Sequence, residues 1–89
     1  MNFEWDRSKA KKNLAKHSVD FADAVSVFDD LNALTLEDHT QQEKRFISIG
    51  IDNFSRLLVV IFTWRSDAIR IISARKATKK EQKQYGEVL

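Results

Sequence analysis

The stretch 57-LLVVIFTWRSDAIRIISARK-76 decides the fold, because it holds two strand patterns joined by a short polar turn. Its first six residues are apolar throughout, which is typical of a central strand covered on both faces. Residues 65–67 supply the turn, and residues 68–76 alternate between two faces. In this alternation Arg75 is in phase with Ile69 and Ile71. We therefore expect its guanidinium on the sheet face that otherwise points inward.

Further strand signals precede this hairpin. Residues 44–51 alternate as a strand, and residues 52–55 have the composition of a turn. Residues 33–37 fit a short strand, and residues 3–5 are a candidate edge strand. The short connections favour antiparallel pairing of these strands.

Polar capping residues predict three helices around the sheet. Asp6 is positioned to cap a helix over residues 7–17, and Asp20, with Asp23 at the capping-box position, to begin a second one. Thr78 and Glu81 match a capping box at the start of a C-terminal helix. The expected core-facing positions of the first two helices are Ala10, Leu14, His17, Phe21, Ala24, Val25 and Phe28. The predicted fold is α+β, a single domain over residues 1–89, with two N-terminal helices, an antiparallel sheet of three or four strands and a C-terminal helix.

Composition narrows the function classes. The chain has 89 residues and no cysteine, which excludes disulfides, thiolate zinc sites and cysteine nucleophiles. The net charge is +3 over residues 1–17, −5 over residues 18–63 and +4 over residues 64–89. No signal peptide or membrane-spanning run is seen, so a cytoplasmic location is expected. Neither histidine has a carboxylate at a recognised ligand spacing, so we expect no metal and no cofactor.

The densest chemical signal lies between Trp64 and Tyr85, where basic and aromatic side chains are interleaved. Guanidinium groups pair with phosphate and aromatic rings stack on unpaired bases, so this pattern favours RNA. RNA also carries its own nucleophile, the 2′-hydroxyl, and an enzyme need only align it, move protons and stabilise the charged phosphorane. The candidate residues are Trp64, Arg65, Arg70, Arg75, Lys76, Lys79, Lys80, Glu81, Lys83 and Tyr85, together with His17.

Each candidate also has a structural interpretation. Glu81 is explained by helix capping alone, and Tyr85 by packing on the sheet. His17 is favoured at a helix C-terminus by the helix dipole. Trp64 fits a core position or a partner contact as well as a stacked base. The lysines of the first helix are most simply a solvated face.

Taken in order along the chain, several segments resemble the BrnT toxin family. They are Phe3-Glu4-Trp5-Asp6, Lys9-Ala10, Asn13, Lys16-His17, Phe21-Ala22-Asp23-Ala24, Val27-Phe28-Asp29, Glu43-Lys44-Arg45-Phe46, Ile49-Gly50, and residues 69–77 with Thr78, Glu81 and Tyr85. One departure is Ser18, where the family usually has glycine after the Lys-His pair. A proline common after the second helix is also replaced, by Leu31 or its neighbour Asp30.

The resemblance implies a RelE-like fold and a metal-independent endoribonuclease that arrests translation. It also implies a BrnA-like antitoxin as partner, in a heterotetramer built on an antitoxin dimer, with operator DNA contacted only through the antitoxin. Under this hypothesis Arg65 and Arg75 bind the scissile phosphate, and Glu81, His17 or Tyr85 transfers protons. The residues expected to hold the RNA are Arg70, Lys76, Lys79, Lys80, Lys83 and Trp64.

Two rival functions fit the same residues. The chain could bind RNA or the ribosome without cutting, which predicts arrested translation with intact transcripts. It could also be an inactive toxin retained as antitoxin partner and operon corepressor, which predicts partner binding without toxicity.

Overall fold

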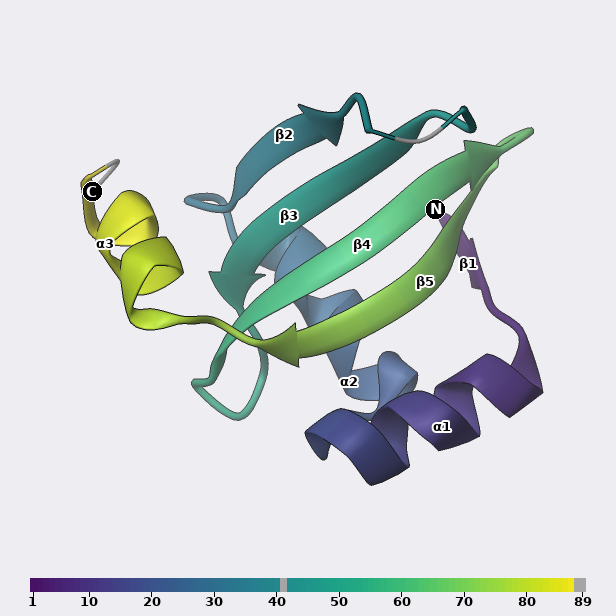
Figure 1. Ribbon diagram of the computed structural model, residues 1–89, viewed down its shortest axis with the longest axis horizontal. Coiled ribbons are helices and arrows are strands. Elements are labelled where there is room, and N and C mark those ends of the chain that lie inside the picture. The colour runs from purple at the N-terminus through teal and green to yellow at the C-terminus, as the bar shows by residue number, and fades with distance from the viewer. Residues whose placement is uncertain (41, 88–89) are drawn as a thin grey trace.

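The computed structural model describes residues 1–40 and 42–87, which form one layer of sheet with helices on both of its faces (Figure 1). The elements in chain order are β1 (Asn2–Glu4), α1 (Arg7–His17), α2 (Phe21–Ala24), the 3₁₀ helix η1 (Val25–Asp29), β2 (Leu34–Asp38), β3 (Arg45–Ile51), β4 (Leu57–Arg65), β5 (Ala68–Lys76) and α3 (Lys79–Glu87).

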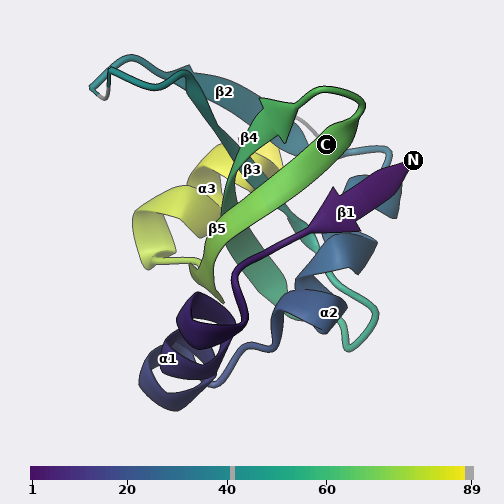
Figure 2. The ribbon, with the colours of Figure 1, turned by 90° about the vertical axis from the view of Figure 1, so that its right-hand side faces the viewer.

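The sheet has five strands in the order β1-β5-β4-β3-β2. Strands β2 to β5 form the expected antiparallel meander, but β1 pairs in parallel with β5, so the sheet is mixed. The prediction of a purely antiparallel sheet of three or four strands was therefore wrong. A strand of three residues is too short to show alternation, and its partner lies more than sixty positions away in the sequence. Figure 2 shows β1 alongside β5.

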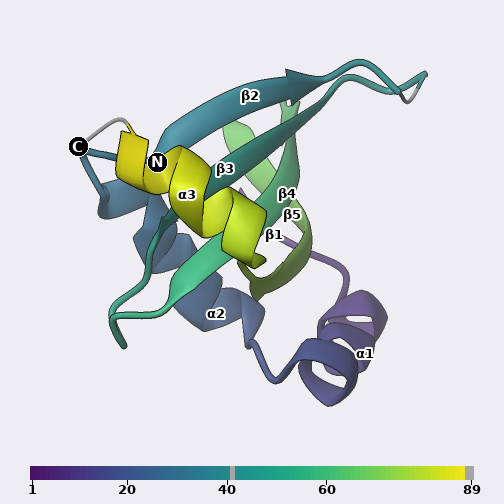
Figure 3. The same cartoon turned by 60° about the vertical axis from the view of Figure 1, so that its left-hand side comes forward.

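Each face of the sheet has its own apolar cluster. On the face covered by α2 and η1, which we call the α2 face, helix residues such as Phe21 and Val27 pack against Leu58 and Val60 of β4. On the opposite face, the α3 face, Tyr85 packs with Ile49, Val59 and their neighbours. Figure 3 shows α3 lying across the sheet on the side away from α2. The apolar run of β4 is thus covered on both sides over its first half, as its composition predicted.

A β-bulge in β5 changes which face Arg75 occupies. Ile61 pairs with Ser73 and Phe62 pairs with Ile71, which leaves Ile72 as an extra residue. One extra residue reverses the alternation beyond it, because side chains in a strand alternate with period two. Arg75, paired with Val59, therefore lies on the α3 face. The prediction that it shares a face with Ile69 and Ile71 was wrong.

Helix α1 begins and ends as its polar residues predicted, but it buries a different residue. The Asp6 carboxylate accepts a hydrogen bond from the Lys9 N–H, and the helix ends at Ser18 in the left-handed conformation, with φ of 59°. Asn13 is the buried position of the helix, whereas Leu14 is 47% exposed. The expected core stripe through Leu14 was wrong, because a polar side chain takes the inward position.

The second helix is shorter and more tightly wound than expected. Asp20 caps it as predicted, but α-helical winding ends at Ala24 and a 3₁₀ helix continues to Asp29. The tighter winding turns Val27 into the core, where it approaches β3 closely at Gly50. A Cβ atom on Gly50 would lie 2.9 Å from a methyl carbon of Val27, so only glycine fits there.

The capping box of α3 is confirmed. The Glu81 N–H donates to the Thr78 hydroxyl, and the Thr78 N–H donates to the Glu81 carboxylate at 2.8 Å. None of the helices in the described part of the chain has the length and apolar composition required to span a bilayer.

Candidate nucleic-acid interface

Helix α1 is fixed to the free edge of β5 by one amide side chain. The Asn13 side chain donates to the Ala74 carbonyl at 2.8 Å and accepts from the Ala74 N–H at 3.1 Å. It also donates to the Val19 carbonyl at 3.0 Å. The amide thus replaces a neighbouring strand beyond the end of β1, and satisfies backbone groups that would otherwise be buried without partners. Since this bonding is neutral, it uses none of the charged groups of the helix.

A basic pocket of about 230 Å³ opens between α1 and β5. Its lining residues are Lys9, Lys12, Asn13, Lys16, His17, Ile72 and Ser73. Within the described part of the chain, none of the three lysines forms an ion pair with a carboxylate. Three ammonium groups close to one another attract an anion such as phosphate. His17 adds an imidazole, a group that commonly transfers protons in catalysis.

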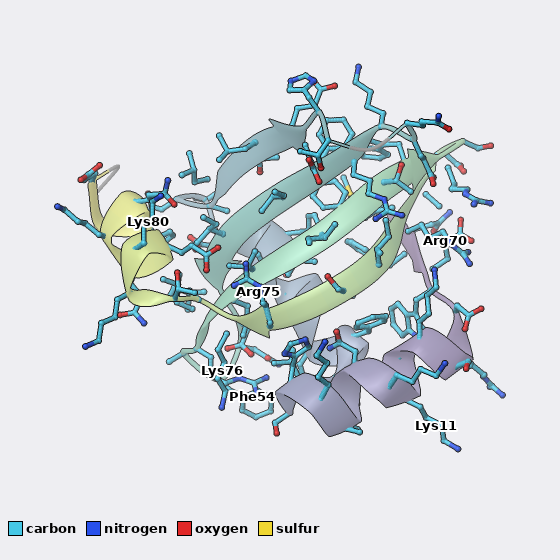
Figure 4. The ribbon with its side chains drawn as sticks, viewed as in Figure 1. Lys11, Phe54, Arg70, Arg75, Lys76 and Lys80 are labelled. Atoms are coloured by element: carbon cyan, nitrogen blue, oxygen red, sulfur yellow. The ribbon has the colours of Figure 1, made fainter. Side chains whose placement is uncertain are left out.

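The α3 face continues from this pocket to Arg75. Ser73 and Arg75 are two residues apart on the same strand beyond the bulge, so both face α3, about 7 Å apart along the strand. Figure 4 shows Arg75 in front of the sheet beside α3. Arg75 does not line the basic pocket, and its guanidinium is directed to Glu81 of α3.

Arg75 is held in place by a bidentate ion pair with Glu81. The two guanidinium–carboxylate distances are 2.7 and 2.9 Å. This pairing, against the opposing effect of burial, is the largest cause that lowers the pKa of Glu81 to about 2. A carboxylate with so low a pKa is a weak proton acceptor at neutral pH. The Glu81 carboxylate is well placed to orient the Arg75 guanidinium, which keeps other N–H groups that can donate to a phosphate.

Tyr85 is also engaged in holding α3 to the sheet. It is buried, and its hydroxyl donates to the Asp30 carboxylate at 2.7 Å. That hydrogen bond, with burial, raises the pKa of Tyr85. Burial disfavours ionisation of Asp30, but donation from the N–H of Ile51, from Tyr85 and from the N–H of Asn32 outweighs it and lowers the pKa of Asp30. Tyr85 therefore does not face the basic pocket as a free acid or base.

The other candidates on the hairpin do not converge with Arg75. Arg65 lies six positions beyond Val59, the residue opposite Arg75, which places it about 20 Å away along β4. Arg70 lies near that same end and is paired with Glu4 at 3.0 Å. Trp64 is 48% exposed but on the α2 face, where it lines a pocket with aromatic residues of the core. Arg65 is therefore too far from Arg75 along the sheet for both guanidinium groups to contact one phosphate.

The C-terminal lysines lie on exposed surfaces around α3. Lys79, Lys80 and Lys83 are exposed on the helix, and Lys76 is exposed at the end of β5. In Figure 4, Lys80 projects from α3. None of these four lysines lines the basic pocket between α1 and β5.

The sequence interpretation missed the lysines of α1, which it took for a solvated face. Lys9, Lys12 and Lys16 recur at helical spacing beside Asn13, so they form one flank of the helix. The signal in the sequence that could have identified these lysines was Asn13 at an inward position of the helix. An inward asparagine indicates that the helix lies against backbone groups and that its basic flank borders the sheet.

The described residues contain no group of three or more side chains suited to holding a metal ion. The arrangement offers lysine ammonium groups that can bind an anion, together with one imidazole. These groups suit binding a phosphodiester and moving a proton beside it.

Comparison with known proteins gives a family match and a structural match. Residues 5–81 match the family described as the ribonuclease toxin, BrnT, of type II toxin–antitoxin systems. The structure is similar to the crystal structure of the Brucella abortus ribonuclease toxin BrnT, with 34% identity and a TM-score of 0.67, over 89% of this chain and 99% of that one. Among curated proteins, no sequence matches.

Proposed function

The chain belongs to the BrnT family of type II ribonuclease toxins, and from this premise we propose that it is a metal-independent endoribonuclease acting at the basic pocket between α1 and β5. The observation that carries the proposal is the pocket itself: three lysines and His17 beside Ser73, on the strand that bears Arg75. In this proposal the RNA substrate supplies the 2′-hydroxyl, and the chain arrests translation by cutting transcripts. A BrnA-like antitoxin neutralises it.

The proposed reaction needs two proton transfers and stabilisation of negative charge. Neutral His17 accepts the proton of the 2′-hydroxyl, whose oxygen then forms a bond to the adjacent phosphorus. The bond from phosphorus to the 5′-oxygen breaks, and a lysine ammonium of the pocket protonates that oxygen. The products are a 2′,3′-cyclic phosphate and a 5′-hydroxyl. The lysines and Arg75 stabilise the phosphorane, because fixed cations lower the energy of an anionic transition state.

The roles proposed for Glu81 and Tyr85 differ from those expected from the sequence. We assign both to positioning: Glu81 orients Arg75, and Tyr85 holds α3 on the sheet through Asp30. Arg65 and Arg70 lie too far along the strands to share the scissile phosphate, so they are assigned to a distant part of the RNA chain. Lys76, Lys79, Lys80 and Lys83 contribute general attraction to the backbone.

The test is cleavage of a defined RNA oligonucleotide by the purified chain in the presence of a chelator. The proposal predicts products ending in cyclic phosphate, and no cleavage of the same oligonucleotide with 2′-O-methyl groups. Lys16→Ala should slow cleavage strongly, whereas Lys79→Ala, a matched lysine on α3, should change it little. Cleavage that requires an added metal ion, or equal effects of the two lysine variants, would contradict the proposal.

Mapping of transcript ends by primer extension after induction separates the rival functions. New 5′ ends with the wild type, and none with Arg75→Ala, support an endoribonuclease. Arrested growth with intact transcripts would instead indicate a non-catalytic RNA- or ribosome-binding module. Normal growth with retained antitoxin binding would indicate an inactive toxin.

A further inference from the structure

A second groove lies on the opposite flank of α1 from the basic pocket. It has a volume of about 590 Å³ and a mostly apolar lining, formed by Arg7, Ser8, Ala10, Lys11, Leu14 and Asp20. Leu14, 47% exposed, is an apolar side chain on an otherwise polar helix surface. We call this the Leu14 groove. An exposed leucine inside an apolar groove is a typical contact point for a protein partner.

The rim of the Leu14 groove is cationic. Arg7 and Lys11 form no ion pair with any carboxylate in the described residues. Figure 4 shows Lys11 directed away from the sheet. Asp20 is the acidic group of the lining, and its carboxylate already accepts from the Ala22 N–H as the cap of α2. The lining thus carries two cations against one carboxylate, and its net positive charge favours a partner with acidic groups beside its apolar contact.

The groove and the basic pocket share one helix. Arg7, Lys11 and Leu14 line one flank of α1, and Lys9, Lys12 and Lys16 line the other. A helix is about 10 Å across, close to the Debye length of about 8 Å at physiological ionic strength. Charges on its two flanks are separated by more than this length, so acidic groups bound in the groove are largely screened from the basic pocket.

We propose that the Leu14 groove is the docking site for a segment of the antitoxin that presents an apolar side chain to Leu14 and acidic side chains to Arg7 and Lys11. This inference rests on the proposed function in taking the antitoxin as the partner. It adds where the antitoxin binds, which is on the helix that carries the RNA-binding lysines. RNA and a second copy of this chain are the alternative occupants.

The test measures antitoxin binding to four purified full-length chains by calorimetry, with the antitoxin produced from the native operon. They are the wild type, Leu14→Glu, the double variant Arg7→Glu with Lys11→Glu, and Leu36→Glu. Leu36 is the matched control, because it is a leucine with 45% exposure that lies away from α1. Loss of a central apolar anchor or of its charge partners should raise the Kd about tenfold or more. The control should stay within about twofold of the wild type, since exposed residues outside an interface contribute little.

Cleavage by the same four chains without antitoxin identifies the occupant. The proposal predicts that Leu14→Glu cleaves RNA as the wild type does but is no longer neutralised by antitoxin. Thermal melting checks that each variant is folded, and Leu14→Ser serves if the glutamate variant does not fold. If Leu14→Glu loses cleavage instead, the groove belongs to RNA. If light scattering shows a dimer of the wild type that Leu14→Glu dissociates, it binds a second copy. Either result, or equal antitoxin affinity for all four chains, would overturn the proposal.

The two hypotheses fail in different ways. A wild type that cuts no RNA, yet binds antitoxin through Leu14, would remove the nuclease and leave the docking site. If the wild type cuts RNA and Leu14→Glu binds antitoxin as tightly as the wild type does, the nuclease proposal would stand and the docking site would be removed.

Discussion

Helices α1 and α3 are both rich in lysine and both lie against the sheet, but they are attached by different chemistry. Helix α1 is docked by the neutral amide of Asn13, so its lysines and His17 take no part in holding it. Helix α3 is docked by Glu81 through Arg75 and by Tyr85 through Asp30. The acid and the phenol that were catalytic candidates in the sequence thus both make contacts that hold α3. The difference teaches that a charged side chain is available for chemistry only where another group attaches its helix or strand to the rest of the fold.

The largest expected effect comes from removing the docking amide of α1. Asn13→Ala should destabilise the protein by about 3 kcal/mol, because two buried carbonyls and one buried N–H lose their partner. Chemical denaturation monitored by circular dichroism measures this. Lys12→Ala, its exposed neighbour on the same helix, should change the free energy of unfolding by less than about 0.5 kcal/mol. Equal losses in the two variants would mean that the amide does not dock α1.

Removing one hydroxyl should weaken α3 less. Tyr85→Phe deletes the bond to the Asp30 carboxylate but keeps the packing of the ring, so we expect a loss of about 1.5 kcal/mol. The raised pKa of Tyr85 means that this contribution is complete below its ordinary value of 10.0 and is lost as pH rises through the higher folded value. Unfolding curves for both proteins should therefore converge in strong alkali. A gap that persists there would show that the hydroxyl acts in another way.

The ion pair between Arg75 and Glu81 should contribute about 1 kcal/mol, since both side chains are partly screened by solvent. Glu81→Gln removes it. Because the folded pKa of Glu81 is depressed from 4.5 to about 2, its stabilising effect is present above pH 4.5 and is lost as pH falls toward 2. The wild type and the variant should differ at neutral pH and become similar near pH 2. An unchanged difference across that range would exclude ionisation of Glu81 as the cause.

The smallest effect is a gain at the end of α1. Ser18→Gly should stabilise the protein by about 0.5 kcal/mol, because Ser18 has φ of 59°, a conformation that glycine adopts without steric cost. Thermal melting detects a shift of this size. Ala15→Gly, inside the same helix, should act in the opposite direction by about 1 kcal/mol. If both glycine variants lower the melting temperature, the left-handed cap is not under strain.

Much of the fold was predictable because it depends on local patterns. The hairpin of residues 57–76 and the caps at Asp6, Asp20 and Thr78 all appear where the sequence indicated. Parallel pairing of β1 was not predictable, since it joins segments far apart in the chain. The bulge at Ile72 was also hidden, because the sequence alternates smoothly through it while the pairing does not.

The candidate site was less predictable than the fold. Arg75 and His17 could be selected as reactive groups, but not the partners that surround them. The pairing of Glu81 with Arg75 and of Tyr85 with Asp30 depends on the docking of α3, which no local pattern specifies. The lysines on the basic flank of α1 could be assigned to a pocket only from the structure, in which Asn13 attaches this helix to β5.

The most direct test of the difference between the two helices is the single-turnover rate of RNA cleavage by His17→Asn and by Tyr85→Phe, measured on folded protein at neutral pH. If α1 carries the proton transfer and α3 is structural, the histidine variant should lose about a hundredfold in rate. The tyrosine variant should stay within about threefold of the wild type, because its hydroxyl contacts Asp30 and not the pocket. Near-normal cleavage by His17→Asn, with cleavage abolished in Tyr85→Phe, would contradict the account.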